Sequence, residues 1–330
     1  MSKILMLGGI VFVAVLILAV YIWREEDRPK VMEAFIIPLK GSQAIFIRTP
    51  NNRRILINGG PNSDIVRVIT SILPFYSRWI DMVIVTDMDD KNVSGLVDIL
   101  ERYKVERLIV PAVTPQSLNL VSTTGGAYSS LLEVARRKEI SIQNISAISY
   151  SRESSNLLNT RSIMIGNRSE GISSSSPNRD LIKIDGITIQ PLFPLPATDF
   201  QYSKASPPQL ILKIIYGDHS FLLIGNASTK IQKAIASNGV GNIGAFITSL
   251  NGSADNISKE LADQTRPKFL VYSKSMPTNS KSSKTAASSK SKKTDLFYWI
   301  MGEDRFNVRE AGTVKIVSDG MKMTFQTKAI

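Results

Sequence analysis

The chain between residues 80 and 95 reads Ile80-Asp81-Met82-Val83-Ile84-Val85-Thr86-Asp87-Met88-Asp89-Asp90-Lys91-Asn92-Val93-Ser94-Gly95. Its first half is an apolar run of the length of a buried strand, and its second half is a tight acidic turn. A helical pattern then opens at Gly95 and continues to residue 100. Strand, turn and helix in this order indicate a central strand of an α/β sheet, and such folds place their chemistry at the C-terminal ends of these strands.

Strand and helix patterns alternate on both sides of this stretch. We predict strands over residues 34–37, 44–48, 54–57, 107–111, 187–192, 244–249 and 267–272. We predict hairpins over residues 209–226, with a turn at Gly217-Asp218, and 313–325, with a turn at Asp319-Gly320. Helical patterns cover residues 63–73, 129–137 and 258–264. The alternation predicts an α/β fold.

Two residue counts limit the chemistry of any site. The chain has 330 residues, enough for one large domain or two smaller ones, and no cysteine. Disulfides, thiolate catalysis and cysteine-based zinc sites are therefore excluded. The sequence has one histidine, His219, so a zinc site with several histidines cannot be built. His219 lies in a predicted hairpin turn, where an exposed polar role is the simpler interpretation than catalysis.

Residues 4–23 carry no charge and end with the pair Tyr21 and Trp23, which is typical of a membrane interface. Twenty helical residues at a rise of about 1.5 Å span a hydrocarbon core of about 30 Å. A cleaved signal peptide would have a shorter apolar region and a small-x-small site, so we predict an uncleaved, single-pass anchor. Residues 24–33 are predicted to be a linker, and residues 34–330 the domain.

Two arguments bear on which side of the membrane the domain lies. Lys3 precedes the apolar run, while Arg24, Arg28 and Lys30 follow it, and this count leans toward a cytoplasmic domain. Acidic residues 25–27 neutralise that flank, and large domains translocate regardless of charge. The family resemblance given below implies an extracytoplasmic domain, and that is the side we predict.

Basic residues dominate the chain, whose formal net charge is +12. Residues 274–293 form a low-complexity tract without an acidic residue, and a flexible loop is predicted over about 274–294. The polyanion-binding residues predicted in this tract are Lys274, Lys281, Lys284, Lys290, Lys292 and Lys293. A solvated loop without a partner explains the tract equally well. A second polar insert is predicted at about residues 151–180.

Several segments in order resemble the metallo-β-lactamase superfamily, and in particular the C-terminal domain of ComEC-type competence proteins and their stand-alone, membrane-anchored relatives. They are residues 44–51, 55–62, Leu73-Pro74-Phe75-Tyr76 and 95–105, and the resemblance is strongest over residues 34–112 and 210–272. The resemblance implies a four-layer αββα sandwich, bound zinc and a DNA-uptake context. In that superfamily the stretch after the central strand reads Thr-His-x-(His/Asp)-x-Asp-His.

The metal ligands that the resemblance implies are largely absent. Aligned with the motif, Asp87 replaces the first histidine, Asp89 is retained, Lys91 replaces the second aspartate and Asn92 replaces the last histidine. Further along, the bridging aspartate is Asn226, and Leu250 stands where a histidine is implied. The acids of the family's first strand and second turn are likewise replaced, by Pro38, Gln43 and Asn58. An ammonium group a few ångströms from a divalent cation repels it, so Lys91 argues most strongly against bound zinc.

Two interpretations of the acidic turn remain. Asp87, Asp89 and Asp90 are carboxylates of the kind that bind Mg²⁺ or Mn²⁺. Alternatively, the turn is solvated, Lys91 pairs with one carboxylate, and Asp89 or Asp90 caps the following helix.

The function predicted from the sequence is therefore a membrane-anchored pseudoenzyme without a cofactor, which acts as a binding or scaffold module and contacts nucleic acid or another polyanion. The first alternative is a hydrolase of phosphoesters or nucleic acid with an altered, Asp-based metal site. The second is a structural subunit of a membrane-associated complex, with a membrane protein as partner.

Overall fold

The computed structural model describes residues 12–13, 15–16, 30–112, 126–145, 181–195, 209–248, 257–273 and 305–328. Most of the predicted anchor, the polar insert and the lysine tract lie outside these residues. Phe12, Val13, Val15 and Leu16 are described, and they are helical and exposed. In the part of the chain that is described, no helix has the length and apolar character needed to span a bilayer.

The first sheet has eight strands in the order β15-β14-β1-β2-β3-β4-β5-β6. Strands β3 to β6 are parallel, and the others pair antiparallel. The strands are β1 (Met32–Leu39), β2 (Ser42–Arg48), β3 (Arg54–Ile57), β4 (Trp79–Ile84), β5 (Lys104–Pro111), β6 (Ser141–Ile145), β14 (Thr313–Ser318) and β15 (Met323–Lys328). β1 thus begins two residues before the predicted start of the domain.

The second sheet has seven strands in the order β13-β12-β11-β10-β9-β8-β7. Strands β10 to β13 are parallel, and the hairpin of β9 and β10 turns at Gly217-Asp218 as predicted. The strands are β7 (Ile182–Ile184), β8 (Ile187–Phe193), β9 (Ile211–Tyr216), β10 (His219–Gly225), β11 (Ala245–Thr248), β12 (Phe269–Tyr272) and β13 (Arg305–Asn307).

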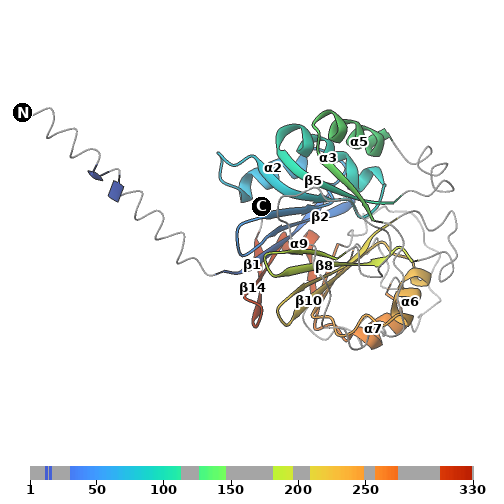
Figure 1. Cartoon of the computed structure of the whole chain (residues 1–330). Coiled ribbons are helices and arrows are strands. Elements are labelled where there is room, and N and C mark those ends of the chain that lie inside the picture. The colour runs from blue at the N-terminus through green and yellow to red at the C-terminus, as the bar shows by residue number, and fades with distance from the viewer. Residues whose placement is uncertain are drawn as a thin grey trace, which may run out of the picture.

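Three layers of buried side chains hold the two sheets and their helices together. Isoleucine-rich inner faces of both sheets, including Ile57, Ile84 and Ile214, form the central core. A second core lies between the first sheet and α2 (Asp64–Ile72), α3 (Asp90–Arg102) and α5 (Gly126–Arg137). A third lies between the second sheet and α6 (Thr229–Ser237) and α7 (Lys259–Thr265). The protein is an α/β sandwich of four layers, with α2, α3 and α5 on one side and α6 and α7 on the other (Figure 1).

The sandwich has two opposite edges that matter for function. The pocket edge is the one at which β3, β4, β10 and β11 end; here Leu210 N donates to Thr86 O at 2.5 Å and joins the two sheets. At the opposite edge, Asp218 N donates to Gly320 O at 2.7 Å and joins the turns of two hairpins. Both sheets therefore extend from the pocket edge to the opposite edge, and a backbone hydrogen bond joins them at each end.

One prediction about the opening stretch is wrong. The helix begins at Asp90 rather than at Gly95, because Asp89 acts as its N-cap and accepts a hydrogen bond from Lys91 N at 3.1 Å. Gly95 lies inside the helix, where it packs against the turn that follows β3. A Cβ atom at Gly95 would lie 2.1 Å from Gly59 O, so only glycine permits this close approach.

Candidate functional site

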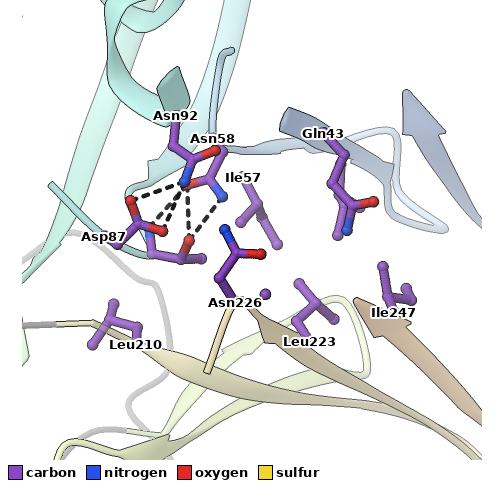
Figure 2. Close-up of a pocket in the computed structure, with 12 residues that line it drawn as sticks. Gln43, Ile57, Asn58, Asp87, Asn92, Leu210, Leu223, Asn226 and Ile247 are labelled. Carbon is purple, nitrogen blue, oxygen red and sulfur yellow. Dashed lines mark hydrogen bonds between the residues drawn. The ribbon is translucent and has the colours of Figure 1, made fainter. Parts of the chain in front are cut away.

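A small cavity of about 30 Å³ lies between the sheets at the pocket edge. Its polar lining comes from both sheets and consists of Gln43, Asn58, Thr86, Asp87, Asn92 and Asn226. Its walls include the apolar residues Ile45, Leu223 and Ile247, which belong to the central core. A cavity of this size has room for one or two water molecules or for a small chemical group. Figure 2 shows the arrangement of these side chains.

Asp87 is the carboxylate of the cavity. Its Oδ1 and Oδ2 accept hydrogen bonds from Asn92 Nδ2 at 2.9 and 2.8 Å (Figure 2). Oδ1 also accepts from Asp89 N at 3.0 Å. Burial raises the pKa of the Asp87 carboxyl, while the hydrogen bonds from Asn92 and Asp89 lower it in part. Asn92, on the first turn of α3, is itself buried, so the pair is held in place on both sides.

Asn58 and Thr86 form a second pair at the ends of β3 and β4. Asn58 Oδ1 accepts from Thr86 N at 2.9 Å, and Asn58 Nδ2 donates to Thr86 Oγ1 at 2.8 Å. Asn58 has a φ of 59°, in the left-handed region that asparagine adopts more readily than most residues. The Asn58 amide therefore both accepts from and donates to Thr86. An ionised aspartate in the same place could only accept.

Asp89, Asp90 and Lys91 do not line the cavity. Lys91 Nζ forms an ion pair with Asp89 Oδ2 at 2.7 Å, and both side chains are partly exposed. Asp89 also caps α3. Of the two interpretations of the acidic turn, the structure supports a capping turn with a paired lysine. The three carboxylates do not face a common point.

The other polar residues reach the cavity from β2 and from the end of β10. Gln43 is 6 % exposed, and its Oε1 has no hydrogen-bond partner in the described part of the chain. Asn226 comes just after β10, and its side chain points toward Asn92 and Asn58 (Figure 2). Two amides thus stand where the sequence resemblance implies carboxylates, one of them with an unpaired acceptor.

Comparisons with known proteins give structural neighbours only. No family model matches the chain, and no curated protein matches it. The similar solved structures include the metallo-β-lactamase fold protein YhfI from Bacillus subtilis, with 10% identity, a TM-score of 0.43 and coverage of 84% of this chain and 95% of that one. A diphosphatase from the PhnP family has 10% identity and a TM-score of 0.41 over 73% and 85% of the two chains. The Rm3 metallo-β-lactamase has 12% identity and a TM-score of 0.38 over 65% and 74%.

The zinc that the sequence resemblance implies does not fit the residues present. Zinc sites in proteins are built from histidine, cysteine and carboxylate ligands. This cavity offers one carboxylate, which already accepts three hydrogen bonds, together with neutral amides and a hydroxyl. Among the described residues, no three His, Asp or Glu side chains gather in a way that would hold a metal ion.

The single histidine lies away from this cluster, and the remaining predicted site positions lie outside the described residues. His219 sits at the edge opposite the pocket, where its Nδ1 lies 2.8 Å from Ser318 Oγ. Leu250 and the lysine tract fall outside the described residues. Ser273, the last described residue before the tract, follows β12, which is parallel to β11 and ends at the pocket edge.

Sequence reasoning missed how the substituted residues interact. It identified Asp87, Asn92 and Asn58 as replacements, but not the hydrogen bonds that pair Asp87 with Asn92 and Asn58 with Thr86. A usable signal was present, because an N-cap at Asp89 places Asp87 and Asn92 on either side of the first helical turn.

Proposed function

We propose that this protein is a non-catalytic member of the metallo-β-lactamase superfamily, attached to the membrane through residues 4–23, and that it works by binding. Two parts of the molecule carry the binding in this proposal. The cavity at the pocket edge receives a hydrogen-bonding group of a ligand or partner protein. The lysine tract of residues 274–293, which follows Ser273 in the sequence, binds a polyanion such as nucleic acid.

The observation that supports a binding role most directly is the pairing of Asp87 with Asn92. A metal-ligating or general-base carboxylate needs free lone pairs directed at the metal or the substrate. Here Asn92 Nδ2 lies 2.8–2.9 Å from both oxygens of Asp87. Asn92 has no ionisable group, so it cannot take a proton from Asp87 or return one to it.

The arrangement of Lys91 and Asp89 points the same way. In the zinc motif these two positions would both supply carboxylates to metal ions. Instead, Lys91 Nζ and Asp89 Oδ2 form an ion pair at 2.7 Å. The one aspartate of the motif that this chain retains therefore already has a cationic partner. Asp89 is also committed as the cap of α3, so a metal would have to compete with both contacts.

The chemistry of the cavity indicates what kind of group it receives. Gln43 Oε1 is buried and has no hydrogen-bond partner among the described residues, and a buried acceptor without a partner costs about 1–3 kcal/mol. Burial raises the pKa of the neighbouring Asp87 carboxyl, whose oxygens already accept hydrogen bonds from Asn92 and Asp89. Hydroxyl, amide and ammonium groups are the donors that satisfy such acceptors, and each is small enough for a space of about 30 Å³.

The experiment that tests this proposal is elemental analysis of the full-length protein purified without chelator, combined with a phosphodiesterase assay in added Mg²⁺, Mn²⁺ or Zn²⁺. We expect metal far below one equivalent per chain and no turnover above background. Stoichiometric metal that is lost in Asp87→Asn, but kept in the matched control Asp263→Asn, would contradict the proposal. Asp263 is exposed on α7, far from the cavity. That result, together with metal-dependent turnover, would establish the Asp-based hydrolase instead.

A further inference from the structure

Four large hydrophobic side chains of the sandwich are exposed: Phe75, Tyr76 and Met321, at 86%, 69% and 81%, and Trp79, at 38%. No other large hydrophobic side chain among the described residues from 30 onward is exposed to this degree. We call this set the aromatic edge. Phe75 and Tyr76 contact each other edge to face, with ring centroids 5.3 Å apart. Scattered exposed hydrophobic residues need no explanation, but a set gathered in one place does.

Strand register places all four at the edge opposite the pocket. Trp79 is the first residue of β4, and Phe75 and Tyr76 lie in the loop that leads into it. β4 runs parallel to β3, whose first residue Arg54 is opposite Arg48. Met321 follows Ser318, which pairs with Met32 at the start of β1. The end of β14, before Met321, and the start of β4 are four strands apart, a lateral separation of about 19 Å along this edge.

Basic side chains lie among these hydrophobic residues. Lys104 Nζ is 4.7 Å from the centroid of the Trp79 ring, and exposed Arg78 neighbours Trp79 in sequence. Lys322 is exposed next to Met321. Arg54 donates to Trp79 O at 3.0 Å and so fixes the loop that carries the aromatic pair. Tryptophan and tyrosine beside lysine and arginine form the composition that settles at the headgroup level of a bilayer.

The described chain of the sandwich begins, at Lys30, at this same edge. Tyr216 Oη donates to Lys30 O at 3.2 Å, which fixes the chain just before β1. Six residues lie between Lys30 and Trp23, the last residue of the predicted anchor, and the seven Cα-to-Cα steps reach at most about 25 Å. The aromatic edge is therefore the part of the sandwich that an anchor at residues 4–23 holds nearest to the membrane.

We propose that the aromatic edge docks onto the surface of the bilayer, with Phe75, Tyr76 and Met321 in the interfacial layer and Arg78, Lys104 and Lys322 at anionic headgroups. The docking rests on the proposed membrane anchor. It fixes the orientation of the whole domain, because the strands run from the aromatic edge to the pocket edge. The cavity and the start of the lysine tract then face the aqueous phase, and their ligands arrive from solution rather than from the lipid.

Single-stranded nucleic acid is the other polymer that binds exposed aromatic rings flanked by basic residues. The position of the chain entry favours the bilayer, because nothing in stacking on bases requires the aromatic rings to lie beside an apolar segment. Met321 adds to this, since it supplies apolar area without a ring on which a base stacks.

The test uses tryptophan as a probe of depth in the full-length chain. The sequence contains three tryptophans, so Trp23→Phe with Trp299→Phe leaves Trp79 as the reporter. The protein is reconstituted in vesicles of phosphatidylcholine and phosphatidylglycerol whose acyl chains are plain or brominated near the headgroup. We expect brominated lipid to quench Trp79 emission. Adding Phe75→Ser and Tyr76→Ser, at two exposed positions, should reduce that quenching.

A matched reporter controls for position. Trp79→Phe with Ser228→Trp in the same background moves the tryptophan to an exposed site at the pocket edge, and its emission should be equal in plain and brominated vesicles. If the protein floats with the vesicles but Trp79 is not quenched, the docking is overturned while the anchor stands. If the protein does not float with the vesicles, the anchor fails and the docking fails with it. Quenching of Trp79 by oligothymidylate but not by brominated lipid would overturn the docking in favour of nucleic acid.

Discussion

At the scale of single residues, Asp87 carries the charge of the cavity and makes stability depend on pH. Because burial raises the pKa of its carboxyl in the folded state, the folded protein holds this proton more tightly than the unfolded chain does. The contribution of Asp87 to stability is therefore most favourable below its unfolded pKa. It is lost as the pH rises toward and through the raised, folded-state pKa.

We predict that Asp87→Asn gains stability relative to the wild type as the pH rises through that window. The measurement is the free energy of unfolding in urea at a series of pH values from mildly acidic to neutral. Asp263→Asn, at an exposed position on α7, is the control and should track the wild type. A difference between Asp87→Asn and wild type that stays constant with pH would mean that Asp87 titrates normally.

The residue scale is also where sequence reasoning stops short. The replacements at Asp87, Lys91, Asn92 and Asn226 are readable once the motif is aligned. Their interactions are not readable, because a lysine next to acids pairs with whichever carboxylate the cap geometry turns toward it. The ion pair with Asp89, and the hydrogen bonds from Asn92 to Asp87, follow from the start of α3 at Asp90.

At the scale of elements, the packing of α3 against the turn after β3 depends on one glycine. Gly95 N donates to Gly60 O at 2.9 Å, and a Cβ atom at Gly95 would lie 2.1 Å from Gly59 O. Gly95→Ala therefore forces the helix away from the sheet. We predict a loss of about 3 kcal/mol in the free energy of unfolding, at the upper end of overpacking costs.

The matched control for this change is Gly126→Ala at the first residue of α5. A Cβ atom there meets nothing within 4 Å, so alanine should leave stability unchanged or raise it by about 0.5–1 kcal/mol. Urea midpoints at a constant slope measure both variants. Equal effects of the two substitutions would contradict the close approach described for Gly95.

Most elements were predictable because their patterns are local. Apolar runs and Gly-Asp or Asp-Gly turns placed β9, β10, β14 and β15 within a few residues. The start of α3 was predicted wrongly at Gly95 because helical periodicity is first legible there, whereas the capping interpretation of the acidic turn, with Asp89 or Asp90 as the cap, agrees with the observed start. A cap competes with a metal-site interpretation for the same aspartates, and the sequence alone does not say which one a given carboxylate serves.

At the scale of the whole molecule, the α/β sandwich was predicted from the sequence, but the difference in residue composition between its two edges was not. Polar residues collect where β3, β4 and β10 end, and exposed hydrophobic residues collect where β1 and β4 begin. Met321 is far in sequence from the adjacent pair Phe75 and Tyr76, so only the register of β14 on β1 and the order of the sheet bring the three to one edge. Such a surface depends on topology and leaves no local pattern.

The last prediction concerns the positive charge of the molecule and its effect on nucleic-acid binding. Replacing the six lysines of residues 274–293 by glutamine lowers the formal net charge from +12 to +6. If the tract binds single-stranded nucleic acid, each neutralised phosphate contributes about 0.7 to the slope of log affinity against log salt, so the slope should fall by up to about 4. Fluorescence anisotropy with a labelled oligonucleotide, measured across a salt series, gives this slope directly.

Two controls make that measurement specific to the tract. Replacing the same six lysines by arginine keeps the charge and should keep the slope. Replacing Arg78, Lys104 and Lys322 by glutamine removes charge at the aromatic edge and should leave the slope nearly unchanged, because that edge is assigned to the bilayer. If the edge variant loses as much slope per charge as the tract variant, net charge alone attracts the polymer, and the tract has no special role. If only the tract variant loses slope, nucleic-acid binding is localised to the tract and does not involve the edge assigned to the bilayer.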